Sequence, residues 1–149
     1  DKSFSVWLPE KSARQWERER TLTVEGKAVK VNVVRVQTKA GLTYSAAALQ
    51  LPYALSRKLP REQRFELLRD AYLAEVKGKI TQETDLKQGR AEGREYQIQT
   101  KKGRARLRVL SLGGRVYEAA VVGSKAQVES KESNAFLDSY KLPAKEKVK

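Results

Sequence analysis

The chain has 149 residues and a mass of 16.9 kDa, with 40% hydrophobic and 33% charged residues, which is typical of one soluble globular domain. It contains neither Cys nor His, which excludes thiol nucleophiles, Ser-His devices, and haem, iron–sulfur or Cys/His zinc sites built from its own side chains. Lys and Arg number 31 against 18 Asp and Glu, a net charge of +13. This excess favours anionic partners without defining a site.

The first part of the chain has the patterns of β-strands. Alternation predicts a strand over residues 4–8 and an exposed strand over 13–24, followed by a turn at Gly26. Over residues 29–36 the alternation of valines changes phase, which indicates either a β-bulge or burial on both faces. Small residues on both sides of 42–51 predict an interior strand, which Pro52 ends.

A helix over residues 61–77 is the clearest single element. Phe65, Leu68, Tyr72 and Val76 recur at helical spacing. Pro60 stands at the favoured entry position and Gly78 at the expected end.

The second half returns to strand patterns. We expect a weak strand over 80–86, a loop over 89–93, a strand through Tyr96 and Ile98, and a turn over 101–103. Further strands are expected around residues 104–109 and over 116–122. Gly113-Gly114 between them predicts a two-residue hairpin with positive φ at both glycines. A final helix over 130–140 is capped by Ser130.

This order predicts an α+β fold, in which an antiparallel sheet is flanked by helices. Residues 1–143 are expected to form a single domain, with 144–149 as a basic C-terminal tail.

Four local motifs resemble those of the PsbP-like superfamily, which includes PsbP and the Ran-binding Mog protein. They are Phe4-Ser5-Val6-Trp7-Leu8-Pro9, Gly93-Arg94-Glu95-Tyr96, Arg108-Val109 with Gly113-Gly114-Arg115-Val116-Tyr117, and Ala135-Phe136-Leu137-Asp138-Ser139-Tyr140. The resemblance implies an α/β/α sandwich that serves as a binding or scaffold module, close to a branch of exported bacterial lipoprotein-like domains. It implies no reaction and carries no shared set of functional residues.

The same motifs have simpler structural interpretations. Phe4 and Phe136 are expected in the core, because aromatic residues at strand or helix period usually pack there. Gly93 and the Gly113-Gly114 pair are expected to supply backbone freedom. Arg94 and Glu95 are interpreted as a local ion pair or cap.

The candidate binding residues lie in a basic segment after Tyr96. Arg104, Arg106 and Arg108 share one strand face, and Lys101 and Lys102 extend the row into the turn. This row is either an anion- or partner-binding face or a solvated strand surface whose long side chains cover apolar neighbours. No exposed aromatic is expected beside it, so the nucleic-acid signature is incomplete.

Other patterns are less specific. The mixed charges around Trp16 are interpreted as a means of preventing another strand from pairing with an edge strand. Glu83 and Asp85 share a strand face, as do Glu17 and Glu19, but the sequence places neither pair in a cleft.

The sequence leads us to expect a non-enzymatic binding or scaffold domain without a cofactor or metal. Its partner is expected to be another protein, and an acidic protein suits the positive charge of the chain. Nucleic acid is disfavoured as a partner. The alternative is a polyanion-binding module that uses the basic strand face. Because Met is absent, Asp1-Lys2-Ser3 is interpreted as a processed or trimmed start. With the resemblance, this suggests export to the periplasm or cell envelope, and an upstream segment could hold the domain near the membrane.

Overall fold

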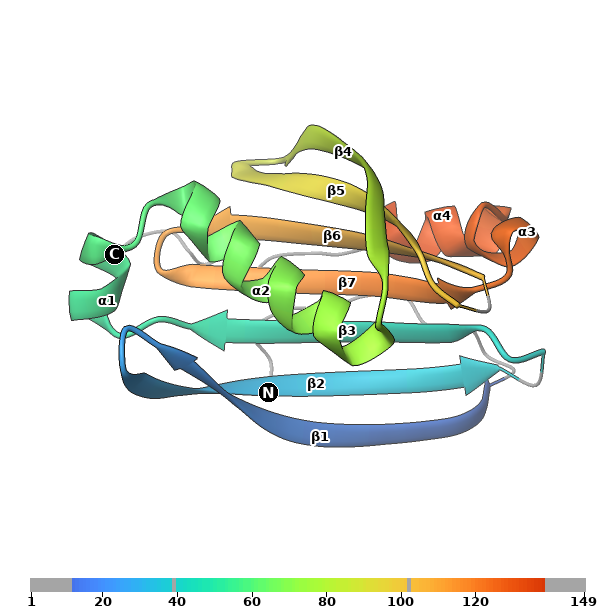
Figure 1. Ribbon diagram of the computed structural model, residues 1–149, viewed down its shortest axis with the longest axis horizontal. Coiled ribbons are helices and arrows are strands. Elements are labelled where there is room, and N and C mark those ends of the chain that lie inside the picture. Colours follow the sequence, from blue (N-terminus) through green and yellow to red (C-terminus); the bar gives the residue numbers. More distant parts are fainter. Residues whose placement is uncertain (1–11, 39, 102, 139–149) are drawn as a thin grey trace.

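The computed structural model describes residues 12–38, 40–101 and 103–138, which form one seven-stranded antiparallel sheet with helices on both faces (Figure 1). The strands are β1 (Ser12–Val24), β2 (Lys27–Thr38), β3 (Thr43–Gln50), β4 (Lys79–Gln88), β5 (Ala91–Gln99), β6 (Arg104–Leu112) and β7 (Arg115–Gly123). The helices are α1 (Tyr53–Lys58), α2 (Arg61–Val76), α3 (Lys125–Val128) and α4 (Lys131–Asp138). The expected α+β class, with an antiparallel sheet and packed helices, is confirmed.

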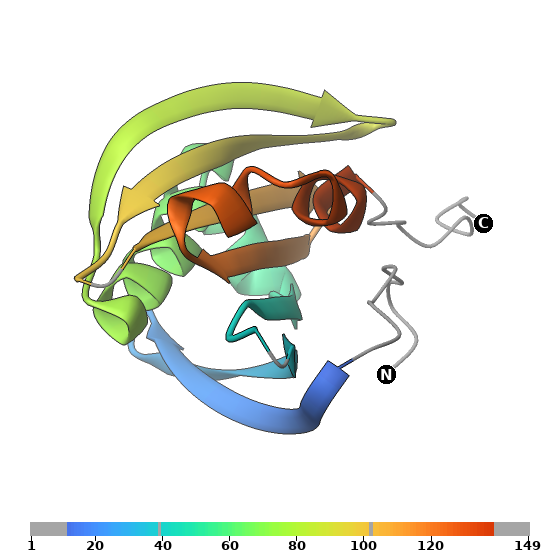
Figure 2. The same cartoon turned by 90° about the vertical axis from the view of Figure 1, so that its right-hand side faces the viewer.

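The sheet consists of two meanders joined at its centre. Its strand order is β1-β2-β3-β7-β6-β5-β4, and β3 pairs with β7. After β3, the chain crosses one face of the sheet through α1 and α2 and re-enters at the opposite edge as β4 (Figure 1). β4 then curves over with β5 beyond the rest of the sheet (Figure 2).

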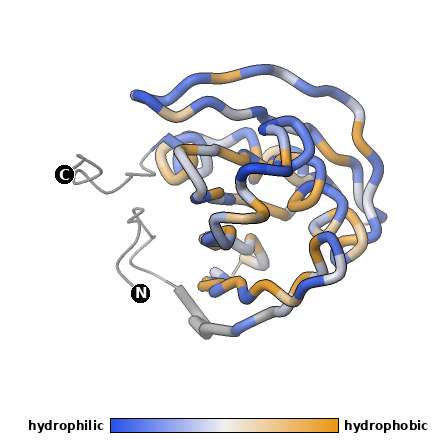
Figure 3. Tube along the Cα trace, turned by 90° about the vertical axis from the view of Figure 1, so that its left-hand side faces the viewer, coloured by the Kyte–Doolittle hydropathy of each residue, from blue (hydrophilic) through white to orange (hydrophobic). Residues whose placement is uncertain are grey.

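Each face of the sheet has its own core. On one face, α2 packs Phe65, Leu68 and Tyr72 against apolar residues of β2, β3, β5 and β6. On the other face, α3 and α4 contribute Val128, Phe136 and Leu137, which pack with residues such as Tyr44 and Tyr117. Burying one such side chain stabilises the fold by about 1.5–3 kcal/mol. The hydrophobic residues of the strands therefore serve two interiors, and Figure 3 shows how they are distributed along the chain.

The strands of the first meander explain the valine phase change. β2 pairs without a register shift along β3, and its only shift with β1 falls between Ser12 and Arg14, on β1. The alternation changes phase because the buried side changes along β2: Val29, Val31 and Val33 are buried between exposed residues, whereas Val36 is buried on the opposite face. The bulge interpretation is wrong. β3 is an interior strand that ends before Pro52, as expected.

Helix α2 has almost the expected bounds, but its end has a different cause. Lys77, with φ of 55°, is the left-handed residue that terminates the helix. Gly78 follows it at a point where a Cβ atom would collide with the Ile98 side chain. The glycine is therefore needed for the close approach of α2 to β5, and not as the left-handed cap.

Two helices and several boundaries differ from the sequence expectations. α1 and α3 were not predicted; they have six and four residues, too short for a helical period to emerge. Residues 91–93 belong to β5 and not to a loop. The hairpin at Gly113-Gly114 forms, but only Gly113 has positive φ, at 62°. Ser130 caps α4 as expected, because its hydroxyl accepts a hydrogen bond from the Ser133 N–H at 3.2 Å.

Some expectations concern residues outside the described part. These are the strand over 4–8 with Phe4, the end of the final helix beyond Asp138, and the tail over 144–149. The side chain of Trp16 also lies outside it, whereas β1 is an edge strand as its charge pattern suggested. Every helix of the described residues is too short or too polar to cross a membrane.

Candidate functional site

The basic row of β6 lies beneath helices and is not an open face. Arg104, Arg106 and Arg108 do share one face, the one that α3 and α4 cover. Arg106 is only 8% exposed, and the Arg108 side chain is 17% exposed. The interpretation of the whole row as a solvated surface is therefore wrong: its central residues are enclosed.

Glu95 on β5 is the acceptor that allows these two arginines to be buried. Its Oε2 lies 3.0 Å from both Nε and Nη2 of Arg106, and its Oε1 lies 2.6 Å from Nε of Arg108. Burial opposes ionisation of Glu95, but hydrogen bonds from Arg108 and Arg106 outweigh it and lower the pKa of the carboxyl group below its usual value. The three groups form one charged network within the layer.

The same arginines fasten the helices to the sheet. Nη1 of Arg106 donates to the Val128 carbonyl oxygen at 3.1 Å and to Oδ1 of Asn134 at 2.6 Å. Nη1 of Arg108 donates to Oδ1 of Asp138 at 2.8 Å. Arg106 and Arg108 are thus engaged within the protein, which limits what they can offer to an external anion.

Arg104 and Lys101, at the end of the row, are more accessible. Arg104 is half-buried and lines a pocket of about 440 Å³ together with Lys125 of α3 and polar side chains of β4, β5 and α4. Lys101 is exposed in the β5–β6 turn, and Lys102 lies outside the described residues. Sequence reasoning missed Lys125, because nothing in the chain indicated that α3 would bring it beside Arg104.

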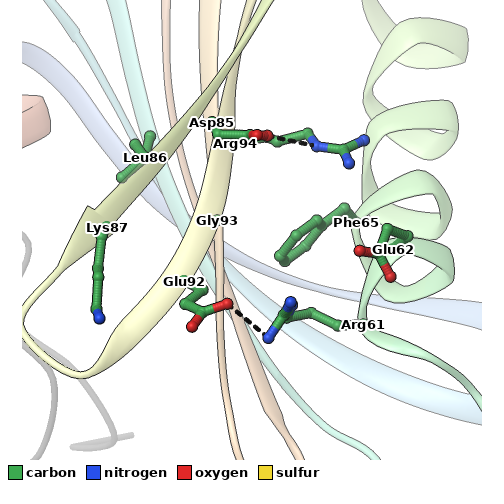
Figure 4. A pocket seen from close by; sticks show the side chains of 9 residues that line it. All are labelled: Arg61, Glu62, Phe65, Asp85, Leu86, Lys87, Glu92, Gly93 and Arg94. Carbon is green, nitrogen blue, oxygen red and sulfur yellow. Dashed lines mark hydrogen bonds and ion pairs between the residues drawn. The ribbon is translucent and has the colours of Figure 1, made fainter.

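A second pocket, of about 370 Å³, lies between α2 and the β4–β5 hairpin (Figure 4). Its floor is Phe65 of α2, which is buried. At one side, Nη1 of Arg61 on α2 lies 2.6 Å from Oε1 of Glu92 on β5. This ion pair spans the gap between helix and sheet, as Figure 4 shows.

On the other side of Phe65, Arg94 bridges β5 and β4. Its Nε donates to Oδ1 of Asp85 at 3.1 Å, and its Nη1 lies 3.7 Å from Oε1 of Glu83. Its guanidinium carbon is 5.8 Å from the centre of the Phe65 ring, within the range of a cation–π contact. Burial opposes the charge of Arg94, but the hydrogen bond to Asp85 raises its pKa.

This pocket resolves two sequence interpretations. Glu83 and Asp85 do share a strand face, and Asp85 reaches a pocket that the sequence did not reveal. Arg94 and Glu95 are both ion-paired, but not with each other. As strand neighbours they point to opposite faces, so Arg94 serves the α2 side and Glu95 the α4 side.

Ser124, Ser130 and Glu19 also have partners within the protein. Ser124 forms a capping box with Gln127 at the start of α3, and Ser130 caps α4. The exposed Glu19 lies 4.0 Å from Lys30 across β1 and β2. Within residues 12–38, 40–101 and 103–138, no three Asp or Glu side chains are placed to hold a metal ion together.

Comparison with known proteins does not extend this description. The chain matches no protein-family model, no curated protein and no solved structure. The resemblance to PsbP-like domains therefore stays a prediction, and function is argued from the two pockets and the surface.

Proposed function

We propose that this protein is a non-enzymatic binding or scaffold domain of PsbP-like type, and that its partner is another protein. The observation that carries the proposal is the pocket between α2 and the β4–β5 hairpin. Its walls alternate in charge and its floor is aromatic. Such a lining suits polypeptide side chains better than a ligand of a single charge.

The Arg61–Glu92 pair makes this pocket adaptable. The two side chains are 47% and 46% exposed, and ion pairs at such exposure contribute at most about 1 kcal/mol. An incoming acidic or basic side chain can therefore replace one partner of the pair at little cost. Phe65 then offers an apolar contact beneath it.

The test is a charge exchange that keeps the pair but reverses its direction. The double variant Arg61→Glu, Glu92→Arg is expected to fold with unchanged Tm and to lose partners that the wild-type chain captures from native envelope extract. Quantitative mass spectrometry of the captured proteins provides the measurement. Lys30→Glu with Glu19→Lys, an exposed pair on β1 and β2, is the matched control. Identical capture by all three chains would contradict the assignment of the pocket.

The cellular location is a separate part of the proposal. We infer export to the periplasm or cell envelope, supported by the sequence resemblance. Fractionation of cells that express the full gene should place the protein in the periplasmic or envelope fraction. Recovery in the cytosol would overturn this location without affecting the pocket.

A polyanion-binding role is the second candidate, favoured by the pocket beside Arg104. Three cations line it, Arg104, Arg106 and Lys125, together with the carboxylate of Glu129 and polar side chains such as Gln82 and Gln97. Heparin binding that weakens steeply with salt, with a slope reduced by Arg104→Glu and Lys125→Glu, would support it. A flat response to salt would remove it. Arg106 is unsuitable as a probe, because it holds α3 and α4.

A further inference from the structure

The α1 end of the molecule carries the most exposed large hydrophobic side chain. Tyr53, the first residue of α1, is 76% exposed, and it is the only exposed large hydrophobic residue among those whose side chains are described. Leu55 and Leu59 of the same segment are buried. The segment therefore already fills its place in the core, and Tyr53 is not needed there.

Tyr53 is held against a cation. The guanidinium carbon of Arg57 lies 5.7 Å from the centre of the Tyr53 ring, one helical turn further along. Lys58 follows Arg57 and is exposed. An aromatic ring and an arginine are the residue types that contribute most to protein interfaces.

The segment that contains this pair carries charge of one sign. From Gln50 to Pro60, the chain contains two basic residues, Arg57 and Lys58, and no Asp or Glu. The tip of the β6–β7 hairpin, residues 112–115, adds no acidic residue. The β1–β2 turn at the same end adds Glu25 and Lys27, which offset each other (Figure 1). Figure 3 views the molecule from this end.

The two segments form one fixed surface. Arg64 of α2 donates to the carbonyl oxygens of Ser56 and Gly113, each at 2.6 Å, and so ties α1 to the hairpin tip. Arg115 Nε donates to Oε1 of Gln50 at 2.9 Å. Because the backbone of α1 is fixed in this way, less conformational entropy is lost when a partner binds to it.

We propose that Tyr53, Arg57 and Lys58 form a docking surface for an acidic polypeptide segment that also carries an apolar residue. Carboxylates of the segment pair with the cations, and its apolar residue packs on the Tyr53 ring. None of these three residues lines the pocket between α2 and the β4–β5 hairpin, so the surface is a contact beyond the function proposed above.

The observations favour a polypeptide over a membrane or nucleic acid. A helix that inserts into a lipid interface needs a broad apolar face, whereas α1 turns Leu55 into the core and exposes one aromatic ring. Single-stranded nucleic acid is bound by a series of stacking aromatics, whereas Tyr53 is the only exposed aromatic residue among the side chains that the structure describes.

The test measures fluorescence anisotropy of a labelled synthetic peptide, rich in Asp and Glu and containing one Leu, with the full chain. Tyr53→Ala and Arg57→Gln should each weaken binding about tenfold, equivalent to about 1.4 kcal/mol. Tyr53→Phe should bind like the wild type, because it retains the ring. Lys101→Gln, which removes an exposed cation from the β5–β6 turn, should leave affinity unchanged within about twofold.

Each alternative result has a definite meaning. Absence of peptide binding, or equal weakening by Lys101→Gln, would overturn the proposal. Binding to phosphatidylglycerol vesicles or single-stranded DNA, with no binding to the peptide, would assign the surface to that ligand instead. If Tyr53→Ala lowers Tm, Lys58→Gln replaces it, because an exposed lysine at the helix end is removed without loss of packing. The Arg61→Glu, Glu92→Arg exchange should not change peptide affinity.

Discussion

Arg106 and Glu95 form an ion pair between adjacent strands in which two nitrogens of the guanidinium, Nε and Nη2, each lie 3.0 Å from the same carboxylate oxygen. The side chains are 10% and 13% exposed. The pair sits where α3 and α4 meet the sheet, because Arg106 also reaches Val128 and Asn134. Its removal should therefore affect both the sheet and the helical layer.

Replacement of Arg106 tests how much this contact stabilises the fold. Arg106→Met should lower the free energy of unfolding by about 3–5 kcal/mol, because it leaves Glu95 with one arginine in a nearly enclosed site. Arg104→Met, two residues earlier on the same face, is the matched control and should cost less than about 1 kcal/mol. Urea denaturation measures both. Equal losses of unfolding free energy in the two variants would show that the burial of Arg106 adds no stability.

The pH dependence of stability should reveal Glu95. Its pKa is lower in the folded protein than its reference value of 4.5, so its contribution to stability is fully present above that value and is lost as the pH falls through the folded pKa. Wild-type Tm should therefore fall at acidic pH. Glu95→Gln should have a lower Tm at neutral pH and a shallower acid decline. Glu19→Gln controls for the loss of one exposed carboxylate, and a decline as steep in Glu95→Gln as in the wild type would contradict the expectation.

Gly93 allows β5 and β6 to lie close together. A Cβ atom at this position would collide with the Val109 carbonyl oxygen and lie 2.9 Å from Cδ2 of Leu110. No positive φ is required there, so the expected backbone freedom is not its role. Gly93→Ala should destabilise the protein by about 1–3 kcal/mol. Gly114→Ala, whose Cβ would lie 3.2 Å from the flexible end of Gln50, should be tolerated; similar Tm losses in both would refute the packing argument.

Arg64 is expected to hold helix α1 in its place. Its Nε donates to the Leu59 carbonyl oxygen at 3.0 Å, in addition to the bonds to Ser56 and Gly113. Arg64→Lys keeps the charge but cannot make this fork of bonds. We expect faster amide hydrogen exchange in residues 53–59 with little change in β2 or β3. Unchanged exchange in α1 would mean that Leu55 and Leu59 alone hold the segment.

The limits of sequence reasoning are clearest in the basic row. Alternation placed Arg104, Arg106 and Arg108 on one face, because side-chain direction along a strand follows from its period of two. It could not tell that α3 and α4 would cover that face, or that Glu95 would meet two arginines at once. The contact of Glu95 with two arginines depends on the strand register, in which Glu95 lies opposite Arg108 and Gln97 lies opposite Arg106.

Local periodicity by itself determined helix α2, most strands, the two-sided burial of residues 42–51 and the core position of Phe136, which is fully buried. These properties depend on neighbours in the chain, so residue spacing contains them. The tertiary structure alone decided which charges were buried, which became pocket walls, and which were presented beside Tyr53. The reason is physical: the burial and pairing of a charged side chain depend on contacts between distant segments, which a one-dimensional pattern does not encode.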